Sequence, residues 1–336
     1  MPTYVVTGGA GFIGSNFVRL ALASRPDLRI ADIDLLTYAG NLENLDGLPE
    51  GRHTFIRADI TDPEAMRKAV PEAADALINF AAETHVDRSI LGPLAFVRTN
   101  VFGTQVLLDV AREKKIRRFV QISTDEVYGS LLPGEKPFTE NHPLVPSSPY
   151  AASKAGADLL VLAAHHTYGQ NVGITRCSNN YGPYQFPEKL IPLMLSNALE
   201  DKPLPVYGDG RQVRDWIHTD DHSRAIMAVV DGGRTGCVYN IGSHSERYNI
   251  DVVRLILKTL GKPDSLIRHV TDRPGHDRRY AIDPTRIRDE LGWQAEAPFE
   301  EGLASTIQWY RDHQDWWRRI KDGTYREFYE KWYGNR

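Results

Sequence analysis

Residues 7–14, Thr7-Gly8-Gly9-Ala10-Gly11-Phe12-Ile13-Gly14, form a glycine-rich turn that satisfies both G-x-G-x-x-G and G-x-x-G-x-x-G. The turn joins a short apolar run, 3–7, to a segment with helical spacing of apolar residues, 12–23. Glycine permits positive φ and close backbone approach to a pyrophosphate, whose charge is favoured at a helix N-terminus. This context predicts a dinucleotide site that includes Gly8, Gly11, Phe12, Ile13 and Gly14.

An acidic residue stands where such a site needs one. Asp34 lies twenty positions after Gly14, at the end of a predicted second strand over 28–33, where a carboxylate binds ribose hydroxyls. Asp32 is the competing carboxylate on the same strand face, further from the strand end. No arginine occurs in 35–38 to accept a 2′-phosphate, so the sequence favours NAD over NADP as cofactor.

The rest of the chain predicts an α/β fold, a doubly wound parallel sheet of the Rossmann type with a smaller C-terminal α/β substrate-binding lobe. Strand-like runs alternate with helical patterns in the first half, and turn-forming residues increase after Arg176. We expect an NAD-binding domain over 1–176 with a returning segment near 213–243, and a lobe from 177–212 and 244–336. The expected strands are 54–56, 76–80, 119–122 and 172–175, and the expected helices are 63–70, 94–114, 150–168, 190–199, 252–260 and 299–317. The aromatic residues near the end are expected to pack in a core: Trp316, Trp317, Phe328, Tyr329 and Trp332.

Two motifs carry the expected chemistry. In Tyr150-x-x-x-Lys154 the two side chains share a helix face, and a nearby ammonium with an oxidised nicotinamide ring would favour the phenolate of Tyr150. In the run 123–129, Thr124 can hydrogen-bond a substrate hydroxyl, while Asp125 and Glu126 supply an acid and a base that a simple dehydrogenase does not need. Either motif alone is commonly a solvated helix face or turn, and the upstream cofactor motif favours redox chemistry coupled to elimination.

Composition limits the partners. The 336 residues carry a net charge of -4, with a pI near 6.3 and no polybasic block, so nucleic-acid binding is disfavoured. Cys177 and Cys237 lie far apart and predict neither a disulfide framework nor a zinc site. The sequence shows no signal-peptide cleavage site and no apolar span of 18 residues. We therefore expect no membrane association and a cytoplasmic location.

Two further polar clusters have a structural and a functional interpretation. His218 and His222 are spaced as in some metal sites, but Thr219 as a helix N-cap followed by two aspartates is favoured, so no metal is expected. Four arginines suit either solvent exposure or bidentate binding of a diphosphate, and the sequence leaves both open: Arg214, Arg273, Arg278 and Arg279.

Over nearly its whole length, the chain resembles the extended short-chain dehydrogenase/reductase family, most closely the dTDP-glucose 4,6-dehydratases. Thr84 is a departure, since many members carry serine there. The resemblance rests on the glycine-rich turn, the two catalytic motifs, and the segments 36–41, 81–87, 176–183 and 273–280.

The resemblance implies a three-step cycle on dTDP-glucose. Tyr150, supported by Lys154 and Thr124, would take the proton of the carbon 4 hydroxyl during NAD-mediated oxidation. Glu126 would then remove the carbon 5 proton and Asp125 would protonate the hydroxyl leaving carbon 6, before hydride returns to carbon 6. The product would be dTDP-4-keto-6-deoxyglucose plus water.

The same resemblance implies binding residues and an assembly. Relatives of this kind form homodimers through the helices that correspond to 94–114 and 150–168. Besides the glycine-rich turn, the NAD site would comprise Asp34, Leu35, Thr37, Asp59, Ile60, Ala81, Ala82, Thr99, Tyr150, Lys154 and Asn180. The nucleotide sugar would be held by Thr84, Thr124, Asn179, Glu188, Lys189, Leu190, Pro205, Tyr207, Arg214, Asn249, Arg273, His276 and Tyr280.

Two alternatives remain at this point. A nucleotide-sugar epimerase or decarboxylase would use Tyr150 without needing Asp125. A cofactor-sensing regulatory protein could use the same fold without catalysis.

Overall fold

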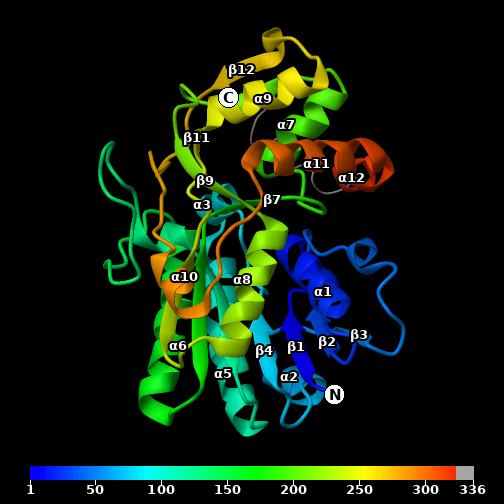
Figure 1. The fold of residues 1–336 in the computed structure, drawn as a ribbon, viewed down its shortest axis with the longest axis vertical. Coiled ribbons are helices and arrows are strands. Elements are labelled where there is room, and N and C mark those ends of the chain that lie inside the picture. The colour runs from blue at the N-terminus through cyan, green and yellow to red at the C-terminus, as the bar shows by residue number, and fades with distance from the viewer. Residues whose placement is uncertain (323–336) are drawn as a thin grey trace.

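The computed structural model describes residues 1–322, and a seven-stranded parallel sheet forms its lower part (Figure 1). The strand order β10-β6-β5-β4-β1-β2-β3 places β1 inside the sheet between β4 and β2, and the chain winds outward from it in both directions. This confirms the doubly wound fold and places a topological switch point between β1 and β4. The strands are β1 Thr3–Thr7, β2 Arg29–Asp34, β3 His53–Arg57, β4 Ala76–Asn79, β5 Phe119–Thr124, β6 Val172–Cys177 and β10 Cys237–Ile241.

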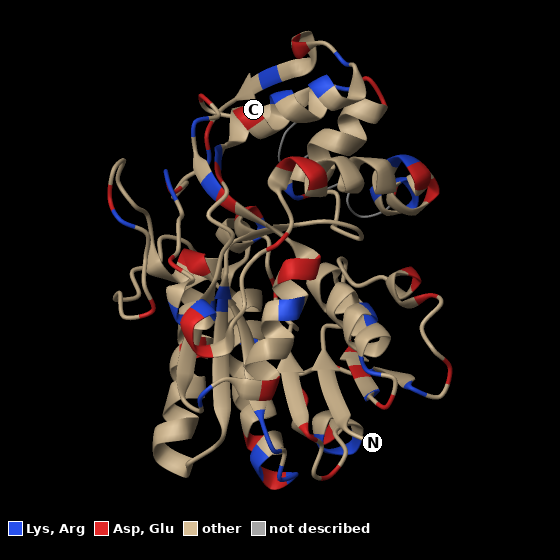
Figure 2. Ribbon diagram, viewed as in Figure 1, with Lys and Arg blue, Asp and Glu red and all other residues tan. Residues whose placement is uncertain are grey.

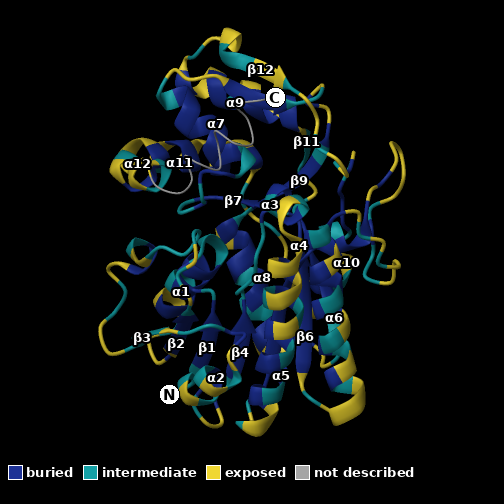
Figure 3. Ribbon diagram, turned by 180° about the vertical axis from the view of Figure 1, so that it is seen from behind, coloured by how far each residue is buried: buried dark blue, intermediate teal, exposed yellow. Residues whose placement is uncertain are grey.

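Helices bury both faces of this sheet. On one face α1 (Phe12–Ser24), α8 (Thr219–Gly232) and α10 (Thr285–Leu291) share a core with β1. On the other, α2 (Pro63–Ala69), α5 (Thr104–Glu113) and α6 (Pro149–Tyr168) enclose a second core. Because both faces are covered, most of the sheet is almost wholly buried, whereas the edge strand β3 has no buried residue (Figure 3).

A smaller lobe lies above the carboxyl ends of the strands (Figure 1). Its helices α7, α9, α11 and α12 surround a third core, and two small sheets, β11-β9-β7 and β12-β8, complete it. The predicted domain division stays a prediction: β9 pairs within the lobe, whereas α8 and β10 return to the large sheet. The bounds are β7 Asn179–Tyr181, α7 Leu190–Leu199, β8 Leu204–Tyr207, β9 Val213–His218, β11 Glu246–Tyr248, α9 Asn249–Leu260, β12 Ile267–Val270, α11 Phe299–Asp312 and α12 Gln314–Lys321.

The helix expected over 94–114 is not regular. It divides into α4 (Pro93–Phe96), a π-helical segment η2 (Val97–Gly103) and α5. At Gly103 an added Cβ would lie 2.6 Å from the side chain of Ile60, and Asn100 donates to Ser153 Oγ over 2.8 Å. These tertiary contacts accompany the wider turn, and π-helical turns are frequent beside functional sites.

The helix expected over 299–317 also divides. α11 ends at Asp312, His313 leaves the helical region, and α12 then begins. The break directs two indoles into the core: Trp317 Nε1 donates to the Tyr310 carbonyl (2.9 Å) and Trp316 Nε1 to Asn44 Oδ1 (3.0 Å). This confirms the packing prediction for Trp316 and Trp317, while Phe328, Tyr329 and Trp332 lie outside the described residues.

One predicted cap was wrong. His218, not Thr219, is the N-cap of α8, and its ring accepts a hydrogen bond from the Asp220 amide. His222 is fully buried and contacts Asn180 Oδ1 through Nδ1 at 2.8 Å.

Figure 2 shows acidic and basic residues interspersed on the same elements. Among residues 1–322, no helix is long and apolar enough to cross a membrane.

Candidate active site

A cavity of about 440 Å³ opens at the carboxyl edge of the large sheet, above the glycine-rich turn. Gly8 has φ +78°, and a Cβ there would lie 2.6 Å from the Ala81 amide nitrogen. At Gly14 a Cβ would meet the Gly8 carbonyl oxygen at 2.2 Å. The turn can therefore pack this tightly on itself and on the Ala81 backbone only because side chains are absent, and such a tight turn before a helix fits a dinucleotide pyrophosphate.

All the predicted cofactor residues lie around this one cavity, although their roles remain predictions. The lining includes Gly8, Gly11, Phe12, Ile13, Gly14, Asp34, Leu35, Thr37, Asp59, Ile60, Ala81, Ala82, Thr99, Tyr150, Lys154 and Asn180.

The two candidate carboxylates of β2 differ in position. Asp34 ends the strand, lines the cavity and accepts hydrogen bonds from the amides of Ala10 (3.1 Å) and Leu36 (2.8 Å). Asp32 is fully buried under Gly9 and contacts His53 Nε2 at 3.2 Å. Asp34 is thus the carboxylate that can reach a ribose.

An arginine that the local sequence did not reveal stands beside Asp34. Arg57 is its register partner on β3. Its Nε donates to the Leu35 carbonyl oxygen at 3.3 Å, and the residue does not line the cavity. Strand pairing brings Arg57 here from outside the 35–38 window that favoured NAD.

Five predicted catalytic residues surround one part of the cavity. Thr124 ends β5 and caps the short 3₁₀ helix η3 (Asp125–Tyr128), which carries Asp125 and Glu126. Tyr150 and Lys154 come from the first turns of α6, which Ser148 caps. The Lys154 ammonium donates to the Ile122 carbonyl oxygen over 2.6 Å, so β5 and α6 fix its position.

The two adjacent carboxyl groups are tuned differently. Burial, followed by the charge of Glu126, raises the pKa of Asp125 well above its usual range. Burial also raises the pKa of Glu126, but the cations Arg273, Lys189 and Arg214 oppose that shift. Pairs of carboxyl groups in unlike surroundings are suited to act as acid and base, respectively.

The expected lowering of the Tyr150 pKa is not produced by the protein's own groups. Burial is the largest of the effects that raise the pKa of Tyr150 well above its usual value. The charges of Glu126, Cys177 and Asp125 raise it further. Within the described chain, a hydrogen bond with Thr124 opposes this rise. Burial also lowers the pKa of Lys154.

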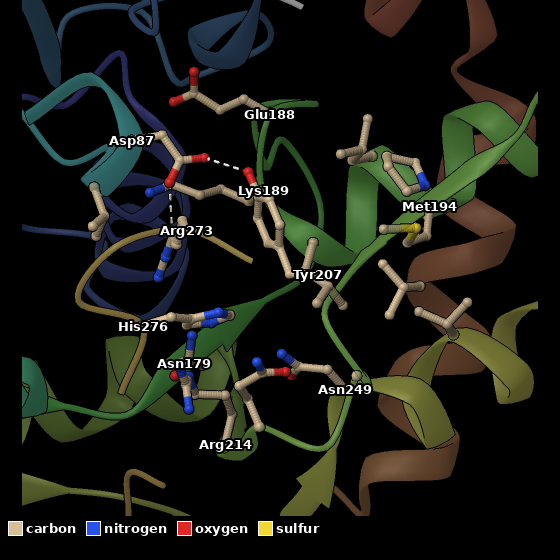
Figure 4. Close-up of a pocket in the computed structure, with 18 of the residues that line it drawn as sticks. Asp87, Asn179, Glu188, Lys189, Met194, Tyr207, Arg214, Asn249, Arg273 and His276 are labelled. Atoms are coloured by element: carbon tan, nitrogen blue, oxygen red, sulfur yellow. Dashed lines mark hydrogen bonds and ion pairs between the residues drawn. The ribbon is translucent and has the colours of Figure 1, made fainter. Parts of the chain in front are cut away.

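A second cavity of about 140 Å³ extends into the smaller lobe (Figure 4). It meets the first at four residues that line both: Glu126, Asn179, Glu188 and Lys189. Of the predicted substrate residues, Thr84 and Thr124 line the larger cavity only. The others that line the smaller cavity are Leu190, Pro205, Tyr207, Arg214, Asn249, Arg273, His276 and Tyr280.

The structure divides the four loop arginines into two pairs. Arg214 and Arg273 line the smaller cavity. Arg278 is instead bound by Asp209 (2.9 Å) and Arg279 by Glu246 (2.6 Å), both outside the cavity lining. The diphosphate interpretation therefore applies to the first pair alone.

Sequence reasoning predicted Asn249 in this cavity but missed Gln212 and Trp216. Gln212 Oε1, Trp216 Nε1 and Asn249 Oδ1 are buried without a hydrogen-bond partner in the described chain, and all three residues line the smaller cavity. Buried polar atoms normally have partners, so these point to a ligand with its own donors and acceptors. Apolar side chains beside them are Leu193, Met194, Val206 and Val253.

With this geometry established, comparison with known proteins identifies the family. The sequence profile of a family described as GDP-mannose 4,6 dehydratase matches residues 5–306. The chain belongs to this family.

Several similar curated proteins are named dTDP-glucose 4,6-dehydratase. The dTDP-glucose 4,6-dehydratase of Xanthomonas campestris pv. campestris (strain B100) is 53% identical over 347 residues, covering 97% of this chain and 98% of that protein.

Solved structures agree in fold. A dTDP-glucose 4,6-dehydratase from Streptomyces venezuelae, solved with NAD bound, is 50% identical with a TM-score of 0.92, covering 95% of this chain and 100% of that one. A UDP-glucose 4-epimerase from Thermotoga maritima, with UDP-glucose, has a TM-score of 0.85 at 27% identity, covering 93% and 99%. The fold is thus shared between dehydratases and epimerases, and the active-site side chains must separate them.

Proposed function

We propose that this chain is a dTDP-glucose 4,6-dehydratase that uses NAD and yields dTDP-4-keto-6-deoxyglucose and water. The observation that carries the proposal is the position of Glu126. It lies where the two cavities meet, next to Asp125 and in the same cavity as Tyr150. An acid, a base and an oxidation site thus surround one volume.

The larger cavity fits NAD. The turn at Gly8 and Gly14 admits a pyrophosphate, and Asp34 offers a carboxylate to the adenosine ribose. When bound, NAD supplies the reversible two-electron oxidation and reduction of the sugar. The protein's residues supply binding, orientation and proton transfer.

Tyr150 and Thr124 act at the carbon 4 hydroxyl. Tyr150 is buried and takes the hydroxyl proton, while Thr124 holds the hydroxyl and the phenol by hydrogen bonding. Because burial raises the pKa of Tyr150, this transfer requires added positive charge nearby. Lys154 lies in the same cavity, and the oxidised nicotinamide ring would supply this charge when bound.

Asp125 and Glu126 act in the elimination. Burial raises the pKa of Asp125 and so favours its protonated carboxyl, which can donate to the hydroxyl leaving carbon 6. The three cations around Glu126 favour its carboxylate, which accepts the proton from carbon 5. Asp125 loses one proton and Glu126 gains one, so the net charge of the pair does not change.

The smaller cavity fits the nucleotide. Arg214 and Arg273 are suited to the diphosphate because guanidinium groups bind phosphate oxygens bidentately. The unpartnered polar atoms of Gln212, Trp216 and Asn249 are suited to the base or deoxyribose.

An isotope experiment tests the function. With deuterium at carbon 4 of dTDP-glucose, we expect the label on carbon 6 of the same molecule, one water lost, and solvent hydrogen at carbon 5. An epimerase would return the label to carbon 4, and a non-catalytic cofactor sensor would leave the sugar unchanged. Parallel incubations with UDP-glucose and GDP-mannose test the nucleotide preference.

We also infer a homodimer formed through α4, η2, α5 and α6. The apolar side chains of Leu94, Phe102 and Leu159 on this surface are 81%, 50% and 58% exposed. The elements α4, η2 and α6 that carry these side chains contact one another, and exposed apolar patches are typical of protein interfaces. Light scattering should give twice the 37.9 kDa chain mass, and Leu94→Glu with Phe102→Glu should give the monomer. A monomeric wild type would contradict this inference.

We place the enzyme in the cytoplasm. Cys177 and Cys237 are both free thiols, which is typical of a reducing compartment. Activity in the soluble fraction of lysed cells, and none in an extracellular or periplasmic fraction, is the expected result.

A further inference from the structure

Asp87 joins two segments of the smaller cavity. It lies in the first turn of α3 (Val86–Leu91) and is 2% exposed. Its Oδ1 accepts a hydrogen bond from Arg273 Nη1 at 2.9 Å, and its Oδ2 accepts one from the Tyr207 hydroxyl at 2.8 Å (Figure 4). Each oxygen therefore binds one cavity residue from a distant part of the chain.

A carboxylate is unexpected at this place. Asp87 lines the cavity proposed to receive a diphosphate, and an unneutralised carboxylate would repel that anion. Its pairing with Arg273 and Tyr207 leaves Arg273 Nε buried with no hydrogen-bond partner in residues 1–322. A buried guanidinium donor without a partner indicates that a ligand acceptor completes the arrangement.

We propose that Asp87 is a positioning residue of the nucleotide-sugar site, which fixes Arg273 and Tyr207 in the orientation that receives the diphosphate. The proposal rests on the function proposed above. Asp87 acts through its two partners, and the diphosphate is bound by the donors that they present.

Asp87 also shares Arg273 with the proposed base. Among the cations that lower the pKa of Glu126, the Arg273 guanidinium has the largest effect. The carboxylates of Asp87 and Glu126 in turn favour the charged form of Arg273. Lys189 faces the same two carboxylates, and Arg214 also acts on Glu126. His85, beside Asp87, has a pKa lowered well below its usual value by burial and is neutral.

Removing the charge of Asp87 has a directional consequence for catalysis. Arg273 and Lys189 would then act on Glu126 without the competing charge of Asp87, so the pKa of Glu126 would fall. Glu126 must be ionised to accept the carbon 5 proton, so the acid limb of the kcat profile would move to lower pH.

A purely structural role makes a different prediction. Acidic residues in the first turn stabilise a helix through its dipole. If Asp87 served only α3, its substitution would lower the melting temperature and leave both nucleotide affinity and the acid limb unchanged.

The test compares Asp87→Asn with Asp87→Glu in the full-length, NAD-saturated protein. Asparagine keeps an acceptor for Tyr207 but loses the charge, and glutamate keeps the charge but shifts it by one methylene. We expect Asp87→Asn to weaken dTDP binding about tenfold or more in calorimetry, the scale of a lost charge-assisted hydrogen bond, and to move the acid limb to lower pH. Asp87→Glu should weaken dTDP binding and leave the acid limb in place.

The possible failures are separable. Wild-type protein that does not bind dTDP would overturn the proposed function itself. Wild-type binding together with unchanged dTDP affinity in the variants would overturn the role of Asp87 alone. If Asp87→Asn does not fold, unchanged affinity in Asp87→Glu has the same meaning. NAD affinity, measured separately, should be the same in all three proteins.

Discussion

The carboxyl groups of Asp125 and Glu126 are adjacent in the chain but face different charges. Asp125 is 2% exposed, and its Oδ2 has no hydrogen-bond partner in the described residues. Glu126 faces Arg273 and Lys189, which come from the smaller lobe. Burial favours the protonated form of both carboxyl groups, and at Glu126 the cations oppose that effect.

Asp125→Asn and Glu126→Gln should each bind dTDP-glucose and reduce the cofactor, yet lose water slowly. Oxidation at carbon 4 precedes elimination, and positioned acids or bases contribute about 10²–10⁴-fold. Absorbance at the reduced-cofactor band and mass loss of one water measure the two steps separately. Glu113→Gln, at a surface ion pair with Arg67, is the matched control. Normal water loss in both active-site variants would contradict the dehydratase mechanism.

Tyr150→Phe should abolish the first oxidation and affect substrate affinity much less. The phenol is the proposed acceptor of the carbon 4 hydroxyl proton, and phenylalanine retains the ring that packs against Phe96. Single-turnover mixing should show no fast cofactor reduction. Tyr168→Phe, at the exposed end of the same helix, should behave as wild type. A wild-type rate in the Tyr150 variant would assign the base elsewhere.

The protein should bind NAD more tightly than NADP, because the Asp34 carboxylate lines the cavity and repels a 2′-phosphate. Calorimetric titration with both cofactors measures this preference. Asp34→Ala should reduce the preference for NAD over NADP. Adding Arg57→Ala to that variant tests whether the neighbouring Arg57 guanidinium binds the 2′-phosphate once Asp34 is absent. Equal or tighter NADP binding by the wild type would contradict the role of Asp34.

The free energy of unfolding should fall as pH drops below about 6.5, in part because of His222. Burial lowers its pKa to about 3, so the unfolded chain binds a proton that the folded chain excludes. This amounts to about 2 kcal/mol at pH 5, at about 1.4 kcal/mol per pH unit. His222→Gln keeps a donor for Asn180 and should lose less stability between pH 7 and pH 5 in urea titrations. The control variant His166→Gln, on the exposed surface of α6, should lose as much stability between pH 7 and pH 5 as the wild type. An equal loss in the His222 variant would contradict this assignment.

Local sequence was sufficient where a function depends on neighbouring residues. The glycine-rich turn, Asp34 at a strand end and the Tyr150–Lys154 helix face each follow from backbone geometry over a few positions. The alternation of strands and helices likewise predicted the doubly wound sheet, because each pattern reflects burial on one or two faces.

Tertiary structure determined the features that depend on distant segments. The wide turn at 97–103 reflects the close approach of Gly103 to Ile60, and the break at His313 accompanies burial of Trp317. No sequence period encodes such contacts.

The sequence by itself determined which chemical groups are present and on which local element each stands. Only the tertiary structure decided their ionisation and partners. Burial raises the pKa of Tyr150 despite the nearby Lys154, and Arg273 interacts with the charges of both Asp87 and Glu126. The physical reason is that desolvation and Coulomb energies depend on distances through space, which the folded packing fixes and the order of residues does not state.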